Sequence, residues 1–339
     1  MKKSLASHII FLIVAAVVSY YFTEIRFYLN EEYKPAALSS LLEGSAARPF
    51  QYRALVPWIV SAISKTGLPL PAIHLPPQLW ITNALSIDHA RSFVLIELIS
   101  VFFLVVAFRY YVSMFLKNDT LSTVLAFTLY LVLPFNYVLP RTAPFWYPYD
   151  MPAILFFTLG LIFLYRQNWP LYYAVFLIGV LNRETICFLT FVYLFTSIGR
   201  RRPTVILLHS GAQLVLWLAI KYFLFQLYSS NPGEGFFETQ LWANIGFLLT
   251  PKRYPFFLSN MGFIVIPIIF YFRLIDDHFV RRSVFVGIPF FLAMIYVADI
   301  WELRIYGELL PIMLLAFLII LEELMVKKSA RVGKTLYSS

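Results

Sequence analysis

Long apolar stretches separated by short polar segments run along almost the whole chain. A hydrocarbon core about 30 Å thick needs roughly 20 apolar residues for each helical crossing. By this measure we expect spans at 8–27, 91–115, 120–138, 150–166, 203–227, 257–273, 283–299 and 308–326. The first span has a basic start, but Tyr20-Tyr21-Phe22-Thr23 lacks the small-x-small pattern of a cleaved signal peptide. We therefore expect it to be retained as a transmembrane helix.

The stretch 169–198 is also apolar, but Asn182-Arg183-Glu184 interrupts it. It is either one long span with a buried ion pair or two short helices that meet at these residues. Two helices place ten Lys/Arg inside and four outside in the segments after residue 184, and one span would reverse that ratio. The sequence therefore predicts an all-α polytopic membrane protein with about ten transmembrane helices. Residues 1–339 form one transmembrane domain with cytoplasmic termini.

Two long segments lie outside in this topology, at 28–90 and 228–256. Within the first, residues 54–65 are too short to span, and the spacing of Leu55, Trp58, Ile59 and Ile63 predicts a helix that lies in the headgroup plane. Residues 66–90 contain four prolines and are expected to be an irregular connector. In the second segment, a turn at Asn231-Pro232-Gly233 precedes another candidate interfacial helix at 236–249.

The composition agrees with a membrane protein and changes the meaning of the net charge. The chain is 60% hydrophobic and only 13% charged, whereas soluble domains carry about 25% charged residues. The predicted inner side has fourteen Lys/Arg and five Asp/Glu, which accounts for the whole net charge of +9. The basic excess therefore records orientation and does not indicate a nucleic-acid partner. One cysteine and five scattered histidines give no metal-ligand spacing, so we expect no metal or cofactor.

The loop 139–152 combines prolines, aromatic residues and two charges. Prolines at 140, 144, 148 and 152 are incompatible with a helix interior. Between them lie Arg141, Trp146, Tyr149 and Asp150. One interpretation is an aromatic belt at the membrane interface. The other is a sugar-binding lip, because aromatic faces stack on pyranose C–H groups and carboxylates accept from sugar hydroxyls.

Several ionisable residues lie at the predicted outer ends of spans. They are Glu24, Arg26, Asp150, Arg183, Glu184, Asp299, Glu302, Arg304 and Glu308. Any single one is explained by a structural ion pair, but charges at four separate span ends in one leaflet favour a polar site. The membrane interior is nearly uncharged apart from Glu97 and Arg109, which argues against an ion-coupled transporter.

Four of these segments resemble the GT-C superfamily of integral-membrane glycosyltransferases, which use polyprenyl-phosphate donors. They are the first outer segment at 23–65, Tyr147-Pro-Tyr-Asp150-Met-Pro152, Arg183-Glu184-Thr185, and Glu302-Leu-Arg304-Ile-Tyr306-Gly-Glu308-Leu-Leu-Pro311. The resemblance implies sugar transfer from a polyprenyl-phosphate-linked sugar to a glycan or lipid acceptor at the outer face of the membrane. The chain departs from the family in having no Asp in its first outer loop before residue 88 and no Asp-x-Asp, which implies chemistry independent of a metal.

This chemistry assigns candidate roles. A carboxylate must take the acceptor proton, and Glu24 is the first candidate and Asp150 the second, with an acceptor-orienting role as its alternative. Arginines suit the departing phosphate, and the candidates are Arg53, Arg183 and Arg304. The candidates for binding the acceptor or the sugar are Arg141, Trp146, Tyr149, Glu184 and Glu302.

Three other interpretations stay open at the level of sequence. A lipid-linked glycan flippase or transporter would move its substrate without forming a glycosidic bond. A polysaccharide polymerase or ligase would need a larger acceptor groove, and a structural assembly subunit would tolerate neutralisation of every outer carboxylate. For the enzyme we expect the bacterial inner membrane, with the active site on the extracytoplasmic side.

Overall fold

The computed structural model of the chain describes residues 5–66, 80–116, 118–140, 142–233 and 239–336. Almost all regular structure in these ranges is helical. The α-helices are α1 Leu5–Leu29, α2 Leu38–Glu43, α3 Leu55–Thr66, α4 Trp80–Ala84, α5 Ile87–Ser113, α6 Asp119–Ala126, α7 Thr128–Tyr137, α8 Asp150–Tyr165, α9 Trp169–Asn182, α10 Phe188–Ser197, α11 Pro203–Leu227, α12 Leu241–Leu248, α13 Tyr254–Leu258, α14 Val265–Tyr271, α15 His278–Ser283, α16 Gly287–Val297 and α17 Leu310–Leu336.

Short 3-10 helices join several of these elements, and two short strands pair with each other. The 3-10 helices are η1 Lys34–Ala36, η2 Phe50–Tyr52, η3 Glu184–Cys187, η4 Pro251–Arg253, η5 Asn260–Phe263, η6 Phe272–Leu274, η7 Val284–Val286 and η8 Leu303–Leu309. The strands β1 Glu31–Glu32 and β2 Phe145–Trp146 run parallel, with Glu31 opposite Phe145. This pairing joins the first outer segment to the proline-rich loop.

The helices make this an all-helical membrane protein. In the described chain, six helical segments are long and apolar enough to cross a membrane: Leu5–Leu29, Ile87–Ser113, Asp119–Tyr137, Pro203–Leu227, His278–Val297 and Leu303–Val326. A seventh is possible if the pair Pro251–Leu258 and Asn260–Leu274, bent by 79°, is one broken span. Three shorter apolar helical segments cover Asp150–Tyr165, Trp169–Asn182 and Glu184–Ser197. The count of ten crossings therefore stays a prediction.

The interruption in 169–198 is a break between two helices, as expected. α9 ends at Asn182, and Arg183 has an extended backbone with φ −159° and ψ 136° before η3 and α10 begin. The prediction of two short helices that meet at Arg183-Glu184 is confirmed.

The proline-rich loop ends inside a helix. The predicted span 150–166 forms α8, which begins at Asp150 and contains Pro152, so the last three residues of the proline-rich loop 139–152 are helical. Proline is tolerated in the first turn, because the N–H it lacks has no partner within the helix there. Asp150 therefore occupies the first position of a helix.

The predicted interfacial segment 54–65 forms the helix α3. Val56 and Val60 are buried against the protein, whereas Trp58 and Ile59 are exposed on the other face. An exposed Trp beside apolar residues is typical of a helix at a membrane interface. Of the second candidate, 236–249, residues 234–238 lie outside the described ranges, and α12 covers Leu241–Leu248.

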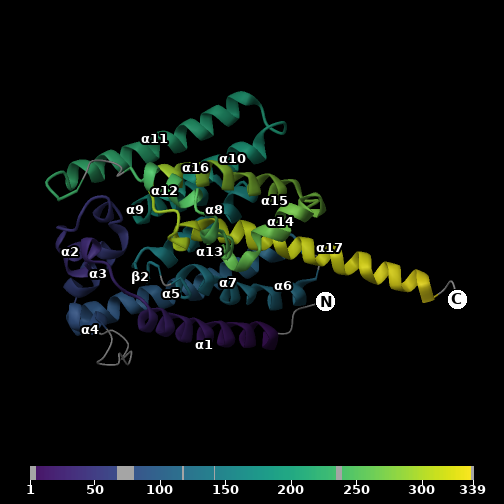
Figure 1. Ribbon diagram of the computed structural model, residues 1–339, viewed down its shortest axis with the longest axis horizontal. Coiled ribbons are helices and arrows are strands. Elements are labelled where there is room, and N and C mark those ends of the chain that lie inside the picture. Colours follow the sequence, from purple (N-terminus) through teal and green to yellow (C-terminus); the bar gives the residue numbers. More distant parts are fainter. Residues whose placement is uncertain (1–4, 67–79, 117, 141, 234–238, 337–339) are drawn as a thin grey trace.

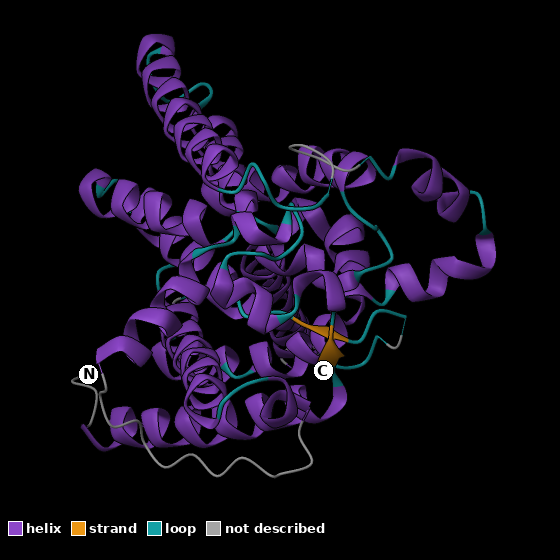
Figure 2. Cartoon of the chain, turned by 90° about the vertical axis from the view of Figure 1, so that its left-hand side faces the viewer, coloured by secondary structure: helices purple, strands orange, loops and turns teal. Residues whose placement is uncertain are grey.

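The helices share one long direction, and their ends separate two faces of the molecule. Figure 1 shows α2, α3 and α4 at one end and the first turn of α1 and the last turn of α17 at the other. Figure 2 looks onto the end that carries α2–α4 and shows the β1–β2 pair among the helices there. The first helix, α1, therefore begins on the same face on which the last helix, α17, ends.

Asn136 of α7 stabilises the bend between α13 and α14. Its Nδ2 donates to Asn260 Oδ1 at 2.8 Å and to the Leu303 carbonyl at 2.7 Å, and its Oδ1 accepts from the Met261 amide at 3.0 Å. Met261, Gly262 and Phe263 all have positive φ. Such a break leaves backbone groups without helical partners, and in a membrane these groups need side-chain partners.

A close approach at Gly307 gives a test of this packing. A Cβ at Gly307 would lie 1.7 Å from the Tyr137 hydroxyl, which donates to the Arg304 carbonyl at 3.1 Å. We expect Gly307→Ala to lower the free energy of unfolding in detergent micelles by about 1–3 kcal/mol, the usual cost of overpacking. Gly211→Ala is the matched control, because nothing lies within 4 Å of a Cβ there. Equal stability of the two variants would contradict this packing.

Candidate functional site

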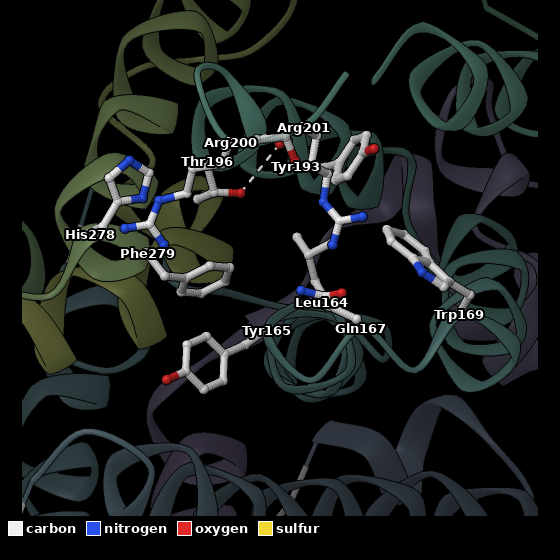
Figure 3. Close-up of a pocket in the computed structure, with 11 residues that line it drawn as sticks. Leu164, Tyr165, Gln167, Trp169, Tyr193, Thr196, Arg200, Arg201, His278 and Phe279 are labelled. Atoms are coloured by element: carbon white, nitrogen blue, oxygen red, sulfur yellow. Dashed lines mark hydrogen bonds between the residues drawn. The ribbon is translucent and has the colours of Figure 1, made fainter. Parts of the chain in front are cut away.

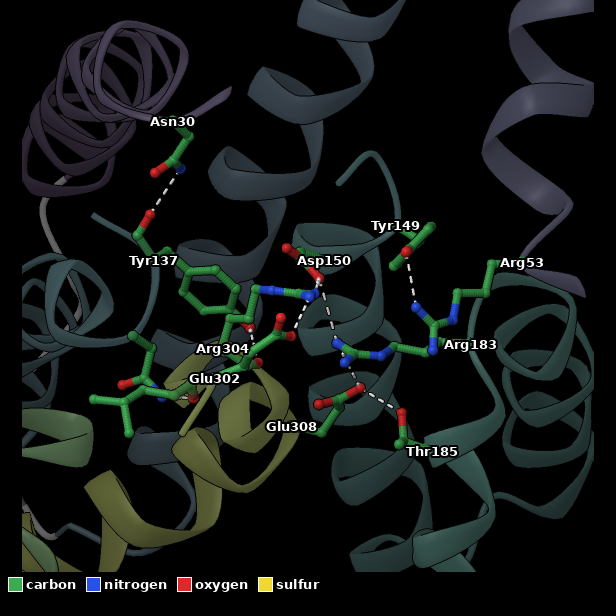
Figure 4. A network of polar contacts seen from close by, with 12 residues as sticks. Asn30, Arg53, Tyr137, Tyr149, Asp150, Arg183, Thr185, Glu302, Arg304 and Glu308 are labelled. Atoms are coloured by element: carbon green, nitrogen blue, oxygen red, sulfur yellow. Dashed lines mark hydrogen bonds and ion pairs between the residues drawn. The ribbon is translucent and has the colours of Figure 1, made fainter. Parts of the chain in front are cut away.

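A buried ion network lies where α1, α5, α8, the α9–α10 junction and η8 meet. The Asp150 side chain is fully buried at the start of α8. Its Oδ2 accepts from Arg26 Nη2 at 3.3 Å, and its Oδ1 accepts from Arg183 Nη1 at 3.4 Å. Arg304 Nη1 lies 4.0 Å from the same Oδ1. Asp150 thus binds three arginines from three separate parts of the chain, and Figure 4 shows Arg183 and Arg304 beside it.

Two further buried carboxylates complete this network. Glu97 of α5 pairs with Arg26, and Glu308 of η8 lies 3.3 Å from Arg183 Nη1 and accepts from the Thr185 hydroxyl. Three buried arginines thus face three buried carboxylates, which balances their formal charge. Balance is required here because an unpaired charge at membrane depth is very unfavourable.

A cavity of about 420 Å³ lies beside this network, and part of its wall comes from residues 33–53, the segment that contains α2. Its charged lining comes from the first outer segment, the α9–α10 junction, α11 and the chain after α16: Arg48, Arg53, Arg183, Glu184, Lys221, Asp299, Glu302 and Arg304. These are five cations and three carboxylates, and two of the cations, Arg183 and Arg304, also pair with buried carboxylates of the network. Arg48 and Lys221 have no carboxylate within 4.0 Å among the described residues, so they leave positive charge at the cavity wall. The cavity is therefore suited to an anionic ligand.

Arg53 is fixed by two partners. Its Nη2 lies 2.7 Å from Glu184 Oε1 and its Nε 3.2 Å from Oε2, so the carboxylate is bound by both oxygens. Its Nη1 donates to the Tyr149 hydroxyl at 2.7 Å. Burial alone would lower the pKa of Arg53, but Glu184 and Tyr149 raise it above its usual value. Burial also raises the pKa of Tyr149 to about 12 despite nearby arginines, so its hydroxyl stays neutral as an acceptor.

Arg183 and Arg304 both line the cavity and bind the buried carboxylates. The Nε atoms of both are buried and have no hydrogen-bond partner among the described residues. Arg304 also pairs with Glu302, and its guanidinium lies over the Tyr147 ring, 3.8 Å from the centroid. Both side chains therefore reach the cavity wall with donor capacity left over.

The second outer segment docks on the first at the rim of this cavity. Asn231 Nδ2 donates to the carbonyls of Gly44 and Ala46 at 2.8 Å each. Arg48 Nη2 donates to the Gly233 carbonyl at 2.6 Å, and the Arg48 amide donates to Pro232 at 2.8 Å. The predicted turn at 231–233 thus holds the two outer segments together.

The structure brings half of the sequence-predicted residues to the cavity. Arg53, Arg183, Glu184, Glu302 and Arg304 line it; Glu24, Trp146, Tyr149 and Asp150 do not, and Arg141 lies outside the described residues. Glu24, the first candidate base, is half-buried on α1. It is not among the residues that line this cavity. Asp150, the second candidate, lies beneath it.

Trp146 and Tyr149 are buried and do not line the cavity. The Trp146 ring packs in a buried cluster with Phe27 at 4.7 Å and Phe93 at 6.1 Å between ring centroids. Tyr149 is fully buried and binds Arg53. The rings that do line the cavity belong to Tyr33, Phe50 and Tyr147. Sequence alone identified the aromatic loop but not which of its rings faces the cavity.

Sequence analysis also missed two features of the site. The Arg26–Glu97 pair joins α1 to α5, and Lys221 is buried in α11 with its Nζ 4.8 Å from the Tyr52 ring centroid. Lys221 carried a signal, because it lies in a 25-residue apolar helix where an ionisable residue indicates a functional site by default. In the described part of the chain, no group of three His, Cys, Asp or Glu residues is placed to hold a metal ion.

Comparison with known proteins gives no match to a family model, to a curated protein or to a solved structure.

Asp150 is expected to be essential for stability. Asp150→Asn removes the negative charge shared by three buried arginines, so we expect a loss of about 3–5 kcal/mol in the free energy of unfolding in detergent. Asp88→Asn is the matched control, because the Asp88 side chain is 73% exposed and its contact with Arg91, at 4.0 Å, is a weak surface ion pair. Its substitution should lower the free energy of unfolding by less than about 1 kcal/mol. Similar melting temperatures for Asp150→Asn and wild type would show that the network is not needed for folding.

Proposed function

We propose that this chain is an inverting glycosyltransferase of the GT-C type that takes a sugar from a polyprenyl-phosphate donor. The cavity carries the proposal, because Arg53, Arg183 and Arg304, the three predicted phosphate ligands, all line it. Lys221 and Arg48 add positive charge, and carboxylates and aromatic rings lie in the same wall. A lipid phosphate, a sugar and a hydroxyl acceptor require these groups together.

The proposal includes ten crossings of a bacterial inner membrane with both termini in the cytoplasm. Six long helices, one bent pair and three short helices supply ten segments. An even number of crossings agrees with α1 beginning and α17 ending on one face. The cavity is at the opposite face, which the positive-inside rule then makes extracytoplasmic.

The arginines hold the leaving group in this mechanism. The acceptor hydroxyl attacks the anomeric carbon, the bond from that carbon to the phosphate oxygen breaks, and polyprenyl phosphate leaves with the electron pair. Nε of Arg183 and of Arg304 are donors without a protein partner among the described residues. Fixed donors at the place where negative charge develops stabilise the transition state.

The general base is drawn from the carboxylates in the cavity wall. Both oxygens of Glu184 bind Arg53, which makes Glu184 a holder of that arginine. Asp299 and Glu302 lie three residues apart on the chain between α16 and η8 and both line the cavity. One of these two carboxylates takes the proton of the acceptor hydroxyl in the proposed reaction, and Tyr33, Phe50 and Tyr147 offer faces to the sugar.

Sugar transfer is tested with purified protein in lipid and a panel of radiolabelled polyprenyl-phosphate sugars. Asp299→Asn and Glu302→Gln are compared with Glu43→Gln, which lies outside the cavity. Loss of a general base should lower kcat by roughly 100-fold or more in one of the first two variants. The control should keep full turnover and the melting temperature of the wild type. Glu302→Gln loses its pair with Arg304, so its turnover is compared at a temperature at which its melting curve shows the folded protein.

Other outcomes decide between this proposal and its rivals. Loss of turnover in a stable Glu24→Gln variant, with Asp299→Asn and Glu302→Gln active, would return the base to α1. Movement of lipid-linked sugar across vesicles without a new glycosidic bond would favour a flippase. Transfer that requires a diphosphate-linked glycan would favour a polymerase or ligase.

Lys221 gives an independent test of donor binding. Lys221→Met keeps the length of the side chain and leaves Glu184 paired with Arg53, so we expect normal stability. The KM for the polyprenyl-phosphate sugar should rise about tenfold, the effect of one charge-assisted hydrogen bond. Lys252→Met changes an exposed lysine that does not line the cavity, and it should leave KM unchanged. An equal KM in both variants would remove Lys221 from the donor site.

A further inference from the structure

A second cavity, of about 380 Å³, is lined by the ends of α8, α9 and α10 that point away from the first cavity. α8 begins at Asp150 in the ion network and ends at Tyr165, which lines the second cavity. Trp169, the first residue of α9, and Tyr193, near the end of α10, line it as well. The 16 residues of α8 separate the two sites by roughly 24 Å, most of the thickness of a hydrocarbon core.

The polar wall of the second cavity is cationic. Arg200 and Arg201 enter it from the connection between α10 and α11, and His278 enters it from the start of α15. Figure 3 shows Arg200 beside His278 and Arg201 on the side of Trp169. The Arg201 guanidinium lies 5.6 Å from the Trp169 ring centroid. Among the described residues that line this cavity there is no Asp or Glu.

The neighbouring carboxylates do not neutralise these arginines. Asp277 precedes His278, but its Oδ1 accepts from the Val280 amide at 2.9 Å and caps α15. Within the described ranges, no carboxylate oxygen lies within 4.0 Å of a guanidinium nitrogen of Arg200 or Arg201. This cavity therefore differs from the first, in which arginines are paired with acids.

We propose that this second cavity binds a phosphate group on the face of the membrane opposite the first cavity. Two arginines without a carboxylate in their wall match the charge of a phosphate, and a planar guanidinium binds its oxygens in pairs. The rings of Trp169, Tyr193 and Phe279 give the wall an apolar part that suits the carbon skeleton attached to the phosphate. Basic pockets between helices on the cytoplasmic side are typical sites for anionic lipid headgroups. The site is independent of the proposed transferase activity.

The experiment measures phosphate binding in full-length protein with three double variants. Arg200→Gln with Arg201→Gln removes the cavity charge, and Arg200→Lys with Arg201→Lys retains it. Arg273→Gln with Arg282→Gln is the matched control, because both residues are exposed, neither lines the cavity, and both lie in the segment around the start of α15. Phosphatidylglycerol retained by the protein from phosphatidylcholine nanodiscs is counted by native mass spectrometry, and binding of inorganic phosphate and glycerol phosphate is measured by calorimetry.

The outcomes separate the two sources of phosphate. We expect phosphatidylglycerol binding to fall about tenfold or more in the glutamine variant at the cavity and to stay near the wild-type level in the control. The same pattern with glycerol phosphate, and none with the lipid, assigns the site to a soluble phosphate ester. The lysine variant should retain part of the binding, which excludes a folding defect as the cause of a loss. Equal loss in the cavity variant and the control, or no loss in either, overturns the proposal.

Discussion

The contact of one carboxylate with three arginines places the strongest constraint on this structure. Asp150 is fully buried and binds Arg26 and Arg183, with Arg304 4.0 Å away, so residues up to 154 positions distant in sequence must converge on it. Removing such charges from water is costly, and only complete pairing offsets the cost. α1, α8, the α9–α10 junction and η8 are therefore held to one geometry. Glu97 and Glu308 complete the pairing and extend the network to α5.

The same network prepares the cavity beside it. Arg183 and Arg304 both bind buried carboxylates and line the cavity. Arg53 is fixed in the same way by Glu184 and Tyr149. Rigid arginines lose little freedom when an anion binds, so pairing that stabilises the fold also favours phosphate recognition. Stability and binding thus depend on the same side chains, and variants at the cavity require a measure of folding beside any measure of activity.

The two ends of α8, α9 and α10 carry different electrostatics. At the first cavity, cations and carboxylates lie in the same wall, which suits a reaction in which a phosphate leaves while a proton is taken up. At the other end, Arg200 and Arg201 lie in a wall without acids among the described residues, which suits static binding of an anion. α9 begins at Trp169 in the wall of the second cavity and ends one residue before Arg183 of the first, and its 14 residues span about 21 Å.

The sequence by itself determined the features that the bilayer imposes. Apolar length identified the helices, and Asn182-Arg183-Glu184 marked the break because polar groups are unfavourable inside a continuous span. Through the chemistry that its resemblance implies, it also named Arg53, Arg183 and Arg304 as phosphate candidates, because arginine suits a departing phosphate, and all three line the cavity.

Only the tertiary structure decided which of these charges faces the cavity and which lies beneath it. Asp150 became the centre of the network, Glu24 lay apart from the cavity, and Trp146 packed into a buried aromatic cluster. Short motifs give the depth of a residue along a helix but not its direction around the axis, nor its partner more than a hundred residues away. The direction of a side chain around its helix and the identity of its distant partner depend on how the helices pack. That packing forms the Arg26–Glu97 and Arg53–Glu184 pairs, on which the site depends.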